Sequence, residues 1–137
     1  MLVDQYFKKI GADDVQILAK NEPGKPEGSD ADVRATFTDL KTNYYVQVKK
    51  RTGKTEMTGL NQIKDYIDYI NSTPDDVDEV NIAWLLTTGY FAEEVIQKAK
   101  DYHDNGEANI RLVDGREFVE MIFNAGIDLL NLKMFDD

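Results

Sequence analysis

The spacing of apolar residues changes from helix-like to strand-like along the first third of the chain. Residues 2–10 carry apolar side chains three or four positions apart and are followed by Gly11, which predicts a first helix. The alternating run Val15–Leu18 predicts a short strand. Residues 21–30 contain two prolines and two glycines, so we expect a loop there.

Two further strand-like runs follow this loop. Ala31–Phe37 and Tyr44–Lys50 contain β-branched and aromatic residues and no internal glycine or proline, which predicts two more strands. The segment between them, residues 39–43, is polar and short, as expected for a hairpin connection. The first half of the chain therefore predicts one helix followed by three antiparallel strands.

The second half alternates helices and buried strands. One apolar stripe at helical spacing consists of Leu60, Ile63, Ile67 and Ile70. Pro74 follows the end of that predicted helix. Val80–Leu86 is almost continuously apolar, which predicts a central strand covered on both faces, and residues 87–89 interrupt it. Thr87 and Thr88 are predicted to cap the following helix, or else to line a site or bind phosphate.

A last helix, strand and helix complete the pattern. The next helical stripe consists of Val95, Ile96, Ala99 and Tyr102. Ile110–Val113 predicts a buried strand, and Asp114 with Glu117 matches a capping box that starts a helix through about Asn124, closed by Gly126. We expect the apolar tail Ile127–Phe135 to pack as a final strand or at a subunit contact.

The predicted order is α-β-β-β-α-β-α-β-α. Strands that are joined through helices run parallel to their neighbours, so we expect an α/β fold with a mixed β-sheet flanked by helices. At 137 residues the chain is long enough for one core, and we expect a single domain over residues 1–137.

Composition narrows the class of protein. The chain has no cysteine, which excludes disulfides and thiolate metal sites and fits a cytoplasmic location. Charged residues between Met1 and Lys9 argue against a secretory signal. The longest apolar stretch, Ile82–Leu86, is too short to cross a bilayer, so we expect no membrane partner.

Charge is distributed unevenly. Residues 41–54 carry five basic side chains and no acid, which leaves −15 for the rest of a chain whose net charge is −10. A basic strip on an acidic body is able to bind phosphates, while the acidic body limits non-specific binding to nucleic acid. A solvated basic turn explains the strip equally well.

The strand Tyr44–Lys50 carries the candidate chemistry. Side chains alternate along a strand, so Gln47 and Lys49 share one face with Tyr45. Burying an amide and an ammonium together costs free energy unless something compensates. Asp32 begins the preceding strand, and a hairpin would bring its carboxylate to the same place. We interpret that place as a metal-dependent phosphodiesterase site.

The chain resembles the Mrr-like restriction endonucleases of the PD-(D/E)xK nuclease superfamily over roughly residues 4–127. The segments that carry the resemblance are Gly28–Val33, Tyr45–Lys50, Leu86–Phe91 and Arg111–Glu117. The resemblance implies a restriction-endonuclease-like fold and Mg²⁺-dependent (or Mn²⁺-dependent) hydrolysis of DNA, often modified or foreign DNA. DNA is then the partner, and a homo-oligomer or a separate DNA-recognition domain works with the chain.

The resemblance also assigns roles to residues. Asp32 takes the place of the metal-binding carboxylate, Gln47 stands where the superfamily has Glu or Asp, and Lys49 is the motif lysine. The helix glutamate of many members has no clear match, although Asp4 lies one helical turn from its place. Mg²⁺ prefers oxygen ligands, which Asp32, the Gln47 side chain and the Val48 carbonyl would supply.

Lys49 would orient or deprotonate the attacking water, with a pKa lowered by burial and the metal. The alternative for Lys49 is a strand-end lysine whose ammonium reaches solvent.

Other residues are assigned around this centre. Asp30 is either an auxiliary ligand or a solvated loop acid. Gln62 and Tyr66 share one helix face and belong either beside the site or to a polar flank with a core-facing tyrosine. The candidate contacts to DNA phosphates are Lys50, Arg51 and Lys54.

Three functions remain open from the sequence. The first is a Mg²⁺-dependent DNA endonuclease, favoured by Asp32 and Lys49. The second is a catalytically inactive module of the same fold that binds DNA or protein, favoured by Gln47 and the missing helix glutamate. The third is a salt-adapted protein whose acidic residues only maintain solubility.

Overall fold

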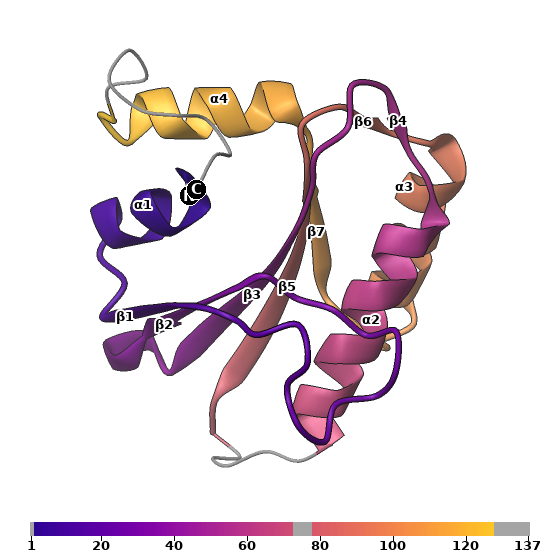
Figure 1. Ribbon diagram of the computed structural model, residues 1–137, viewed down its shortest axis with the longest axis horizontal. Coiled ribbons are helices and arrows are strands. Elements are labelled where there is room, and N and C mark those ends of the chain that lie inside the picture. The colour runs from indigo at the N-terminus through magenta and orange to yellow at the C-terminus, as the bar shows by residue number, and fades with distance from the viewer. Residues whose placement is uncertain (1, 73–77, 128–137) are drawn as a thin grey trace.

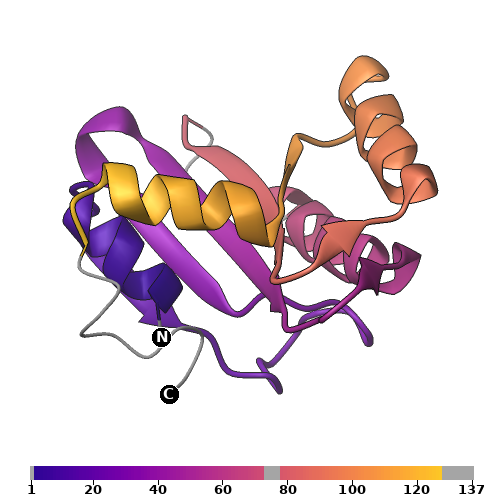
Figure 2. The same cartoon turned by 90° about the horizontal axis from the view of Figure 1, so that it is seen from above.

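The computed structural model describes residues 2–72 and 78–127. A five-stranded sheet lies between two helical layers, with α1 and α4 on one face and α2 and α3 on the other (Figure 1). The helices are α1 (Leu2–Lys9), α2 (Met57–Ser72), α3 (Glu93–Asp104) and α4 (Gly115–Asn124). Seen from above, α4 crosses one face of the sheet while α2 and α3 lie beyond the other (Figure 2).

The sheet is mixed, in the order β1-β2-β3-β5-β7. Its strands are β1 (Asp14–Ile17), β2 (Val33–Phe37), β3 (Thr42–Lys49), β5 (Val80–Thr87) and β7 (Ile110–Val113). The first three pair antiparallel, and β3, β5 and β7 pair parallel through the crossover helices. The predicted fold and the predicted order of helices and strands are confirmed.

Short elements add to the predicted pattern. A 3₁₀ turn, η1 (Thr38–Leu40), lies between β2 and β3. The two-residue strands β4 (Lys54–Thr55) and β6 (Tyr90–Phe91) form a separate parallel pair. Segments this short carry no periodic signal, because two residues cannot establish an alternation.

Alternation along the central strands separates two cores. Tyr45, Ala83 and Leu85 pack with α2 and α3, whereas Trp84 and Leu86 pack with α1 and α4. All side chains from Ala83 to Leu86 are buried, so the prediction of a strand covered on both faces is confirmed for this part of Val80–Leu86. The start of the strand is less covered, with Val80 at 53% exposure. Trp84 lies among the rings of Tyr6, Phe7 and Tyr44 and under the Arg111 guanidinium.

The helix ends test two capping predictions. The Asp114 side chain accepts a hydrogen bond of 2.8 Å from the Glu117 amide, which confirms that Asp114 starts α4. The reciprocal bond of a capping box is not formed, because the Glu117 carboxylate accepts from Arg111 instead. The prediction that Thr87 and Thr88 cap α3 is wrong, because its N-cap residue is Ala92 and both hydroxyls are engaged elsewhere.

Two predicted features lie outside the described residues, and the described helices bear on a third expectation, the absence of a membrane span. The proline stop at Pro74 and the apolar tail from residue 128 onward lie outside the described residues. Within the described part of the chain, none of the helices has the length and apolar character needed to cross a bilayer.

Candidate active site

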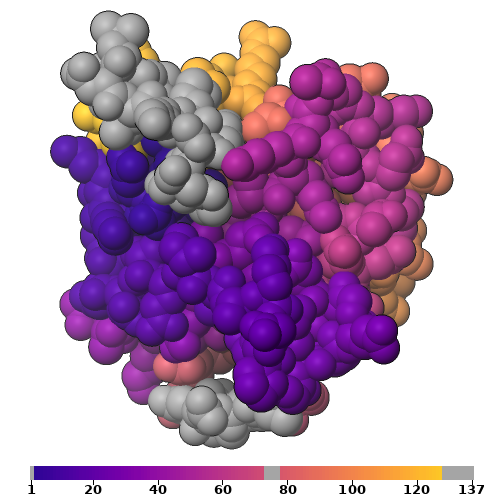
Figure 3. Space-filling model, in the orientation of Figure 1, coloured from indigo at the N-terminus to yellow at the C-terminus, as the bar shows by residue number. Residues whose placement is uncertain are grey.

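The candidate site lies at the carboxyl end of β3, where the loop before β2 and the helix α2 approach it. Figure 1 shows that loop leaving β1, running to α2 and returning to β2, and Figure 3 shows the corresponding indigo-to-violet residues covering the lower front of the molecule. Leu18 N donates to Asp32 O over 2.9 Å, which joins the two ends of the loop, and Asp30 N donates to Gln62 O over 3.1 Å, which joins the loop to α2.

Asp32 is fixed against the backbone of β3. Its amide donates to the Val46 carbonyl over 2.7 Å, and its Oδ2 accepts from the Val48 amide over 2.6 Å. Asp32 itself lies in a bend of the chain, and β2 begins at Val33 rather than at the predicted Ala31. The Asp32 carboxylate therefore lies at the backbone of the residue between Gln47 and Lys49.

Gln47 is fully buried and only half satisfied. Its Nε2 donates to Gln62 Oε1 over 2.7 Å and to Asp30 Oδ2 over 3.3 Å. Both partners are acceptors, which fixes the amide orientation. Gln47 Oε1 is buried without a hydrogen-bond partner. An unmet buried acceptor costs about 1–3 kcal/mol, so the fold bears this cost at the centre of the candidate site.

Lys49 lies on the same face as Gln47 and shares its partner. Lys49 Nζ donates to Gln62 Oε1 over 2.7 Å. Burial lowers the pKa of Lys49 below its usual value, Asp30 opposes that effect, Arg51 adds to it and Asp32 opposes it. The side chain passes close to α2 at Gly59, where a Cβ atom would lie 3.2 Å from Lys49 Cε. A glycine at this position leaves room for the lysine stem.

Lys20 joins the site without having been predicted. Its ammonium forms ion pairs with both Asp30, at 3.0 Å from Oδ2, and Asp32 Oδ1. Burial alone would lower the pKa of Lys20, but its hydrogen bonds to Asp32 and Asp30 raise it above the usual value. The lysine belongs to an irregular loop, so only the three-dimensional contact reveals it. Asp30, which the sequence left between auxiliary ligand and solvated acid, contacts Lys20 and Gln47.

Of the two α2 residues predicted near the site, Gln62 belongs to the site and Tyr66 to the core. Gln62 accepts from both Gln47 and Lys49. Tyr66 is buried in the core beneath α2, and its hydroxyl donates to Glu22 Oε1 over 3.0 Å. Burial, and then the Glu22 carboxylate, raise the pKa of Tyr66 above its usual value. Asp4 lies on α1, on the opposite face of the sheet, where it pairs with Lys8.

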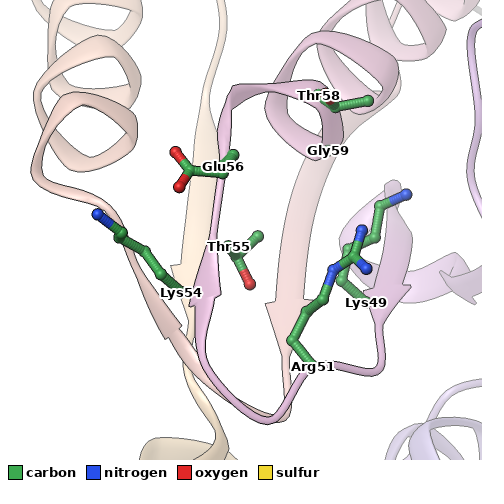
Figure 4. Close-up of a pocket in the computed structure, with 7 residues that line it drawn as sticks. All are labelled: Lys49, Arg51, Lys54, Thr55, Glu56, Thr58 and Gly59. Atoms are coloured by element: carbon green, nitrogen blue, oxygen red, sulfur yellow. The ribbon is translucent and has the colours of Figure 1, made fainter.

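A basic pocket of about 350 Å³ adjoins Lys49. Arg51 and Lys54 line it together with the first turn of α2. Figure 4 shows the Arg51 side chain beside Lys49, whereas Lys54 points away from them on the side of Glu56. Lys50 is exposed and does not line this pocket. Within residues 2–72 and 78–127, none of Lys50, Arg51 and Lys54 forms a salt bridge.

The segment after β5 holds this basic loop in place. Thr88 Oγ1 donates to the Arg51 carbonyl over 2.6 Å and accepts from the Arg51 amide over 2.7 Å. The Thr88 amide donates to the Lys49 carbonyl over 3.1 Å. A Cβ atom at Gly89 would lie 2.0 Å from the Gly53 carbonyl oxygen, so the approach requires glycine. Thr88 thus positions Arg51 relative to Lys49, a role that local sequence patterns do not signal.

The site supplies oxygen atoms of the type that a hard divalent cation binds. They are the carboxylates of Asp30 and Asp32 and the unpartnered Gln47 Oε1, and Mg²⁺ prefers such ligands. The described residues contain no group of three His, Cys, Asp or Glu side chains suited to a metal ion. Ligation by the Val48 carbonyl stays a prediction.

A family model described as restriction endonuclease (Mrr_cat) matches residues 1–122. The crystal structure of AF1548, a protein of unknown function, aligns with a TM-score of 0.69 at 14% identity, over 99% of this chain and 70% of that chain, and shows the same fold. The restriction endonuclease MspJI, in complex with a 27-mer oligonucleotide, aligns with a TM-score of 0.49 at 15% identity, over 88% of this chain and 26% of that chain. A search of curated proteins found no match.

Proposed function

This chain belongs to the restriction endonuclease family that the Mrr_cat model describes, and from that premise we propose that it is a Mg²⁺- or Mn²⁺-dependent DNA endonuclease of the restriction or defence type. The observation that carries the proposal is the network at the end of β3. It joins Asp32, Gln47 and Lys49 through Val48, Asp30 and Gln62.

The residues that would hold the cation are Asp32, Asp30, Gln47 through Oε1, and Val48 through its carbonyl. When bound, a divalent cation neutralises charge on the phosphate and lowers the pKa of water that attacks phosphorus. Lys49 is suited to orient that water as an ammonium and, after losing a proton to solvent, to receive the proton of the water as a neutral amine; burial favours the neutral form by lowering the pKa of Lys49. Gln62 holds the Lys49 ammonium in position.

The basic strip is suited to the DNA backbone. Lys50, Arg51 and Lys54 form no ion pairs with the described acids and are free to contact phosphates. Such contacts position a duplex without reading its sequence. The acidic remainder of the chain, at −15, restricts binding to this strip. A second copy of the chain or a separate DNA-recognition domain stays a prediction.

Two features favour an inactive DNA- or protein-binding module as the second candidate. Gln47 offers a neutral ligand where the wider superfamily has an acid, and neutral ligands bind divalent cations more weakly. Lys20 already pairs with both carboxylates. The two candidates differ in catalysis and not in fold.

Plasmid cleavage separates the two candidates. Supercoiled plasmid, methylated and unmethylated, is incubated with the protein and Mg²⁺ or Mn²⁺. We expect Asp32→Asn and Lys49→Met each to reduce the cleavage rate by about 100-fold or more. Asp65→Asn and Lys100→Met remove the same charges from exposed positions on α2 and α3 and should leave the rate unchanged. Equal cleavage by all variants contradicts the site. Absence of cleavage by every protein, with retained DNA binding, favours the inactive module.

A further inference from the structure

The ion pairs of Lys20 differ from the others in the structure. Lys8, Lys41, Lys64, Arg111 and Arg116 each pair with one acid among the described residues, whereas Lys20 pairs with two. Those two acids are the carboxylates of the candidate cation site. Lys20 therefore places a positive charge between two carboxylates that would otherwise repel each other.

The two sides of this contact differ in exposure. The side chains of Asp30 and Asp32 are 20% and 14% exposed, and that of Lys20 is 63% exposed. The carboxylates belong to the body of the site, since Asp32 is bound to the β3 backbone and Asp30 to Gln47. Lys20 reaches them from solvent on a flexible stem, so its ammonium can leave without disturbing the sheet.

Gln47, which contacts Asp30, has one unsatisfied polar atom. Gln47 turns its Nε2 toward Asp30, and Gln47 Oε1 remains buried without a partner. The three N–H donors of the Lys20 ammonium are already used by the two carboxylates. A divalent cation, in contrast, binds several oxygen ligands at once. Exposed ion pairs contribute little stability, so replacing the lysine contact by a cation sacrifices little.

We propose that Lys20 is an internal counter-ion that occupies the Asp30–Asp32 pair and is displaced by the divalent cation, so that it sets the cation concentration at which the site loads. This inference rests on the cation site of the proposed function. Lys20 is not a catalytic residue in this scheme, because it contacts the ligands and not the phosphodiester. Repulsion between an ammonium and a divalent cation makes the two occupants mutually exclusive.

Direct Mn²⁺ binding tests the inference independently of cleavage. Binding is measured from loss of the free Mn²⁺ electron paramagnetic resonance signal, without DNA. We expect Lys20→Gln to bind Mn²⁺ about tenfold more tightly than the unaltered protein. Lys20→Arg, which keeps the charge, should bind like the unaltered protein. Lys25→Gln is the matched control: it removes one lysine from the same loop, but Lys25 contacts the Ser29 carbonyl instead of the carboxylates.

Three other results would overturn the inference. Equal tightening by Lys20→Gln and Lys25→Gln would show a general effect of net charge, and an unchanged affinity in Lys20→Gln would show that Lys20 does not compete. Absence of Mn²⁺ binding in all proteins would remove the site that Lys20 is proposed to occupy. The plasmid assay distinguishes the two proposals. If the protein cleaves DNA but Lys20→Gln binds Mn²⁺ no more tightly, the counter-ion proposal is wrong and the nuclease proposal stands.

Discussion

Strand β3 carries two buried amides on the same face, four residues or about 13 Å apart, and they are satisfied to different degrees. Asn43 uses both ends of its amide: Oδ1 accepts from Thr36 over 2.8 Å, and Nδ2 donates to Glu79 and Asn81, each over 3.1 Å. Gln47 uses only its nitrogen. The satisfied amide stabilises the sheet, and the unsatisfied one marks the place where a ligand is expected.

The largest expected difference between the amides is in cleavage. Gln47→Leu removes the amide at similar volume and should reduce the cleavage rate by about 100-fold, or about 2.7 kcal/mol. Its free energy of unfolding should change by less than about 1 kcal/mol, because the unmet acceptor disappears together with the donor.

Asn43→Leu should behave in the opposite way. Its free energy of unfolding, measured by urea denaturation, should be lower by about 1–3 kcal/mol, and the cleavage rate of the folded protein should be unchanged. The comparison of the two amides is wrong if Asn43→Leu is the variant that loses cleavage, or if Gln47→Leu is the one that unfolds.

Changing each amide to its acid sharpens the comparison. Gln47→Glu adds a negative charge beside Asp30, and we expect it to be destabilised by about 1–2 kcal/mol without metal and to recover with Mn²⁺. Asn43→Asp loses its donors to Glu79 and Asn81 and should be destabilised with and without Mn²⁺. Melting temperatures at several Mn²⁺ concentrations measure both. A Mn²⁺ response in Asn43→Asp would contradict the assignment of the cation to the Gln47 end.

A smaller effect is expected at the basic loop beside Lys49. Thr88→Val removes both hydrogen bonds to the Arg51 backbone and should weaken DNA affinity about tenfold at low salt. The rate at saturating DNA should change less, because Thr88 positions a phosphate contact. Thr88→Ser keeps the hydroxyl and should restore the affinity. Failure of serine to restore it would assign the effect to packing and not to the hydrogen bonds.

The smallest effect is expected at Gly59. An added Cβ would lie 3.2 Å from Lys49 Cε and 3.3 Å from Leu85 Cδ1, so the lysine stem must move by a few tenths of an ångström. Gly59→Ala should therefore reduce the cleavage rate two- to threefold, by roughly 0.4–0.7 kcal/mol. Its stability should remain close to that of the unaltered protein, because alanine favours the helix. A change of a hundredfold or more would place Gly59 in contact with the substrate.

The sequence predicts the framework well because its signals are local. Periodicity identifies the central strand Val80–Leu86 and the stripe of α2, and Asp114 identifies the start of α4. Strand ends were less predictable: β3 begins at Thr42, two residues early, because its partners Phe37 and Val80 extend the pairing. Pairing of this kind depends on residues far apart in the chain.

In the candidate site, too, residues with a local sequence signal were predictable and residues that act across long sequence separations were not. Alternation along β3 places Gln47 and Lys49 on one face, and the structure gives both of them Gln62 as a partner. Lys20 and Thr88 were missed or misassigned, since one acts from a loop across 12 residues and the other across 37. Neither lies in a pattern that their neighbours in sequence reveal.

The single tryptophan lies on the side of the sheet away from Gln47, packed among aromatic rings beneath α1 and α4. Its emission is therefore a built-in optical reporter for that layer, whereas Tyr45 and Tyr66 belong to the layer that contains the candidate site. If the Trp84 fluorescence transition in denaturant coincides with loss of far-ultraviolet circular dichroism, the two layers melt as one cooperative unit. If the fluorescence changes first, the α1–α4 layer can loosen while the site layer keeps its structure.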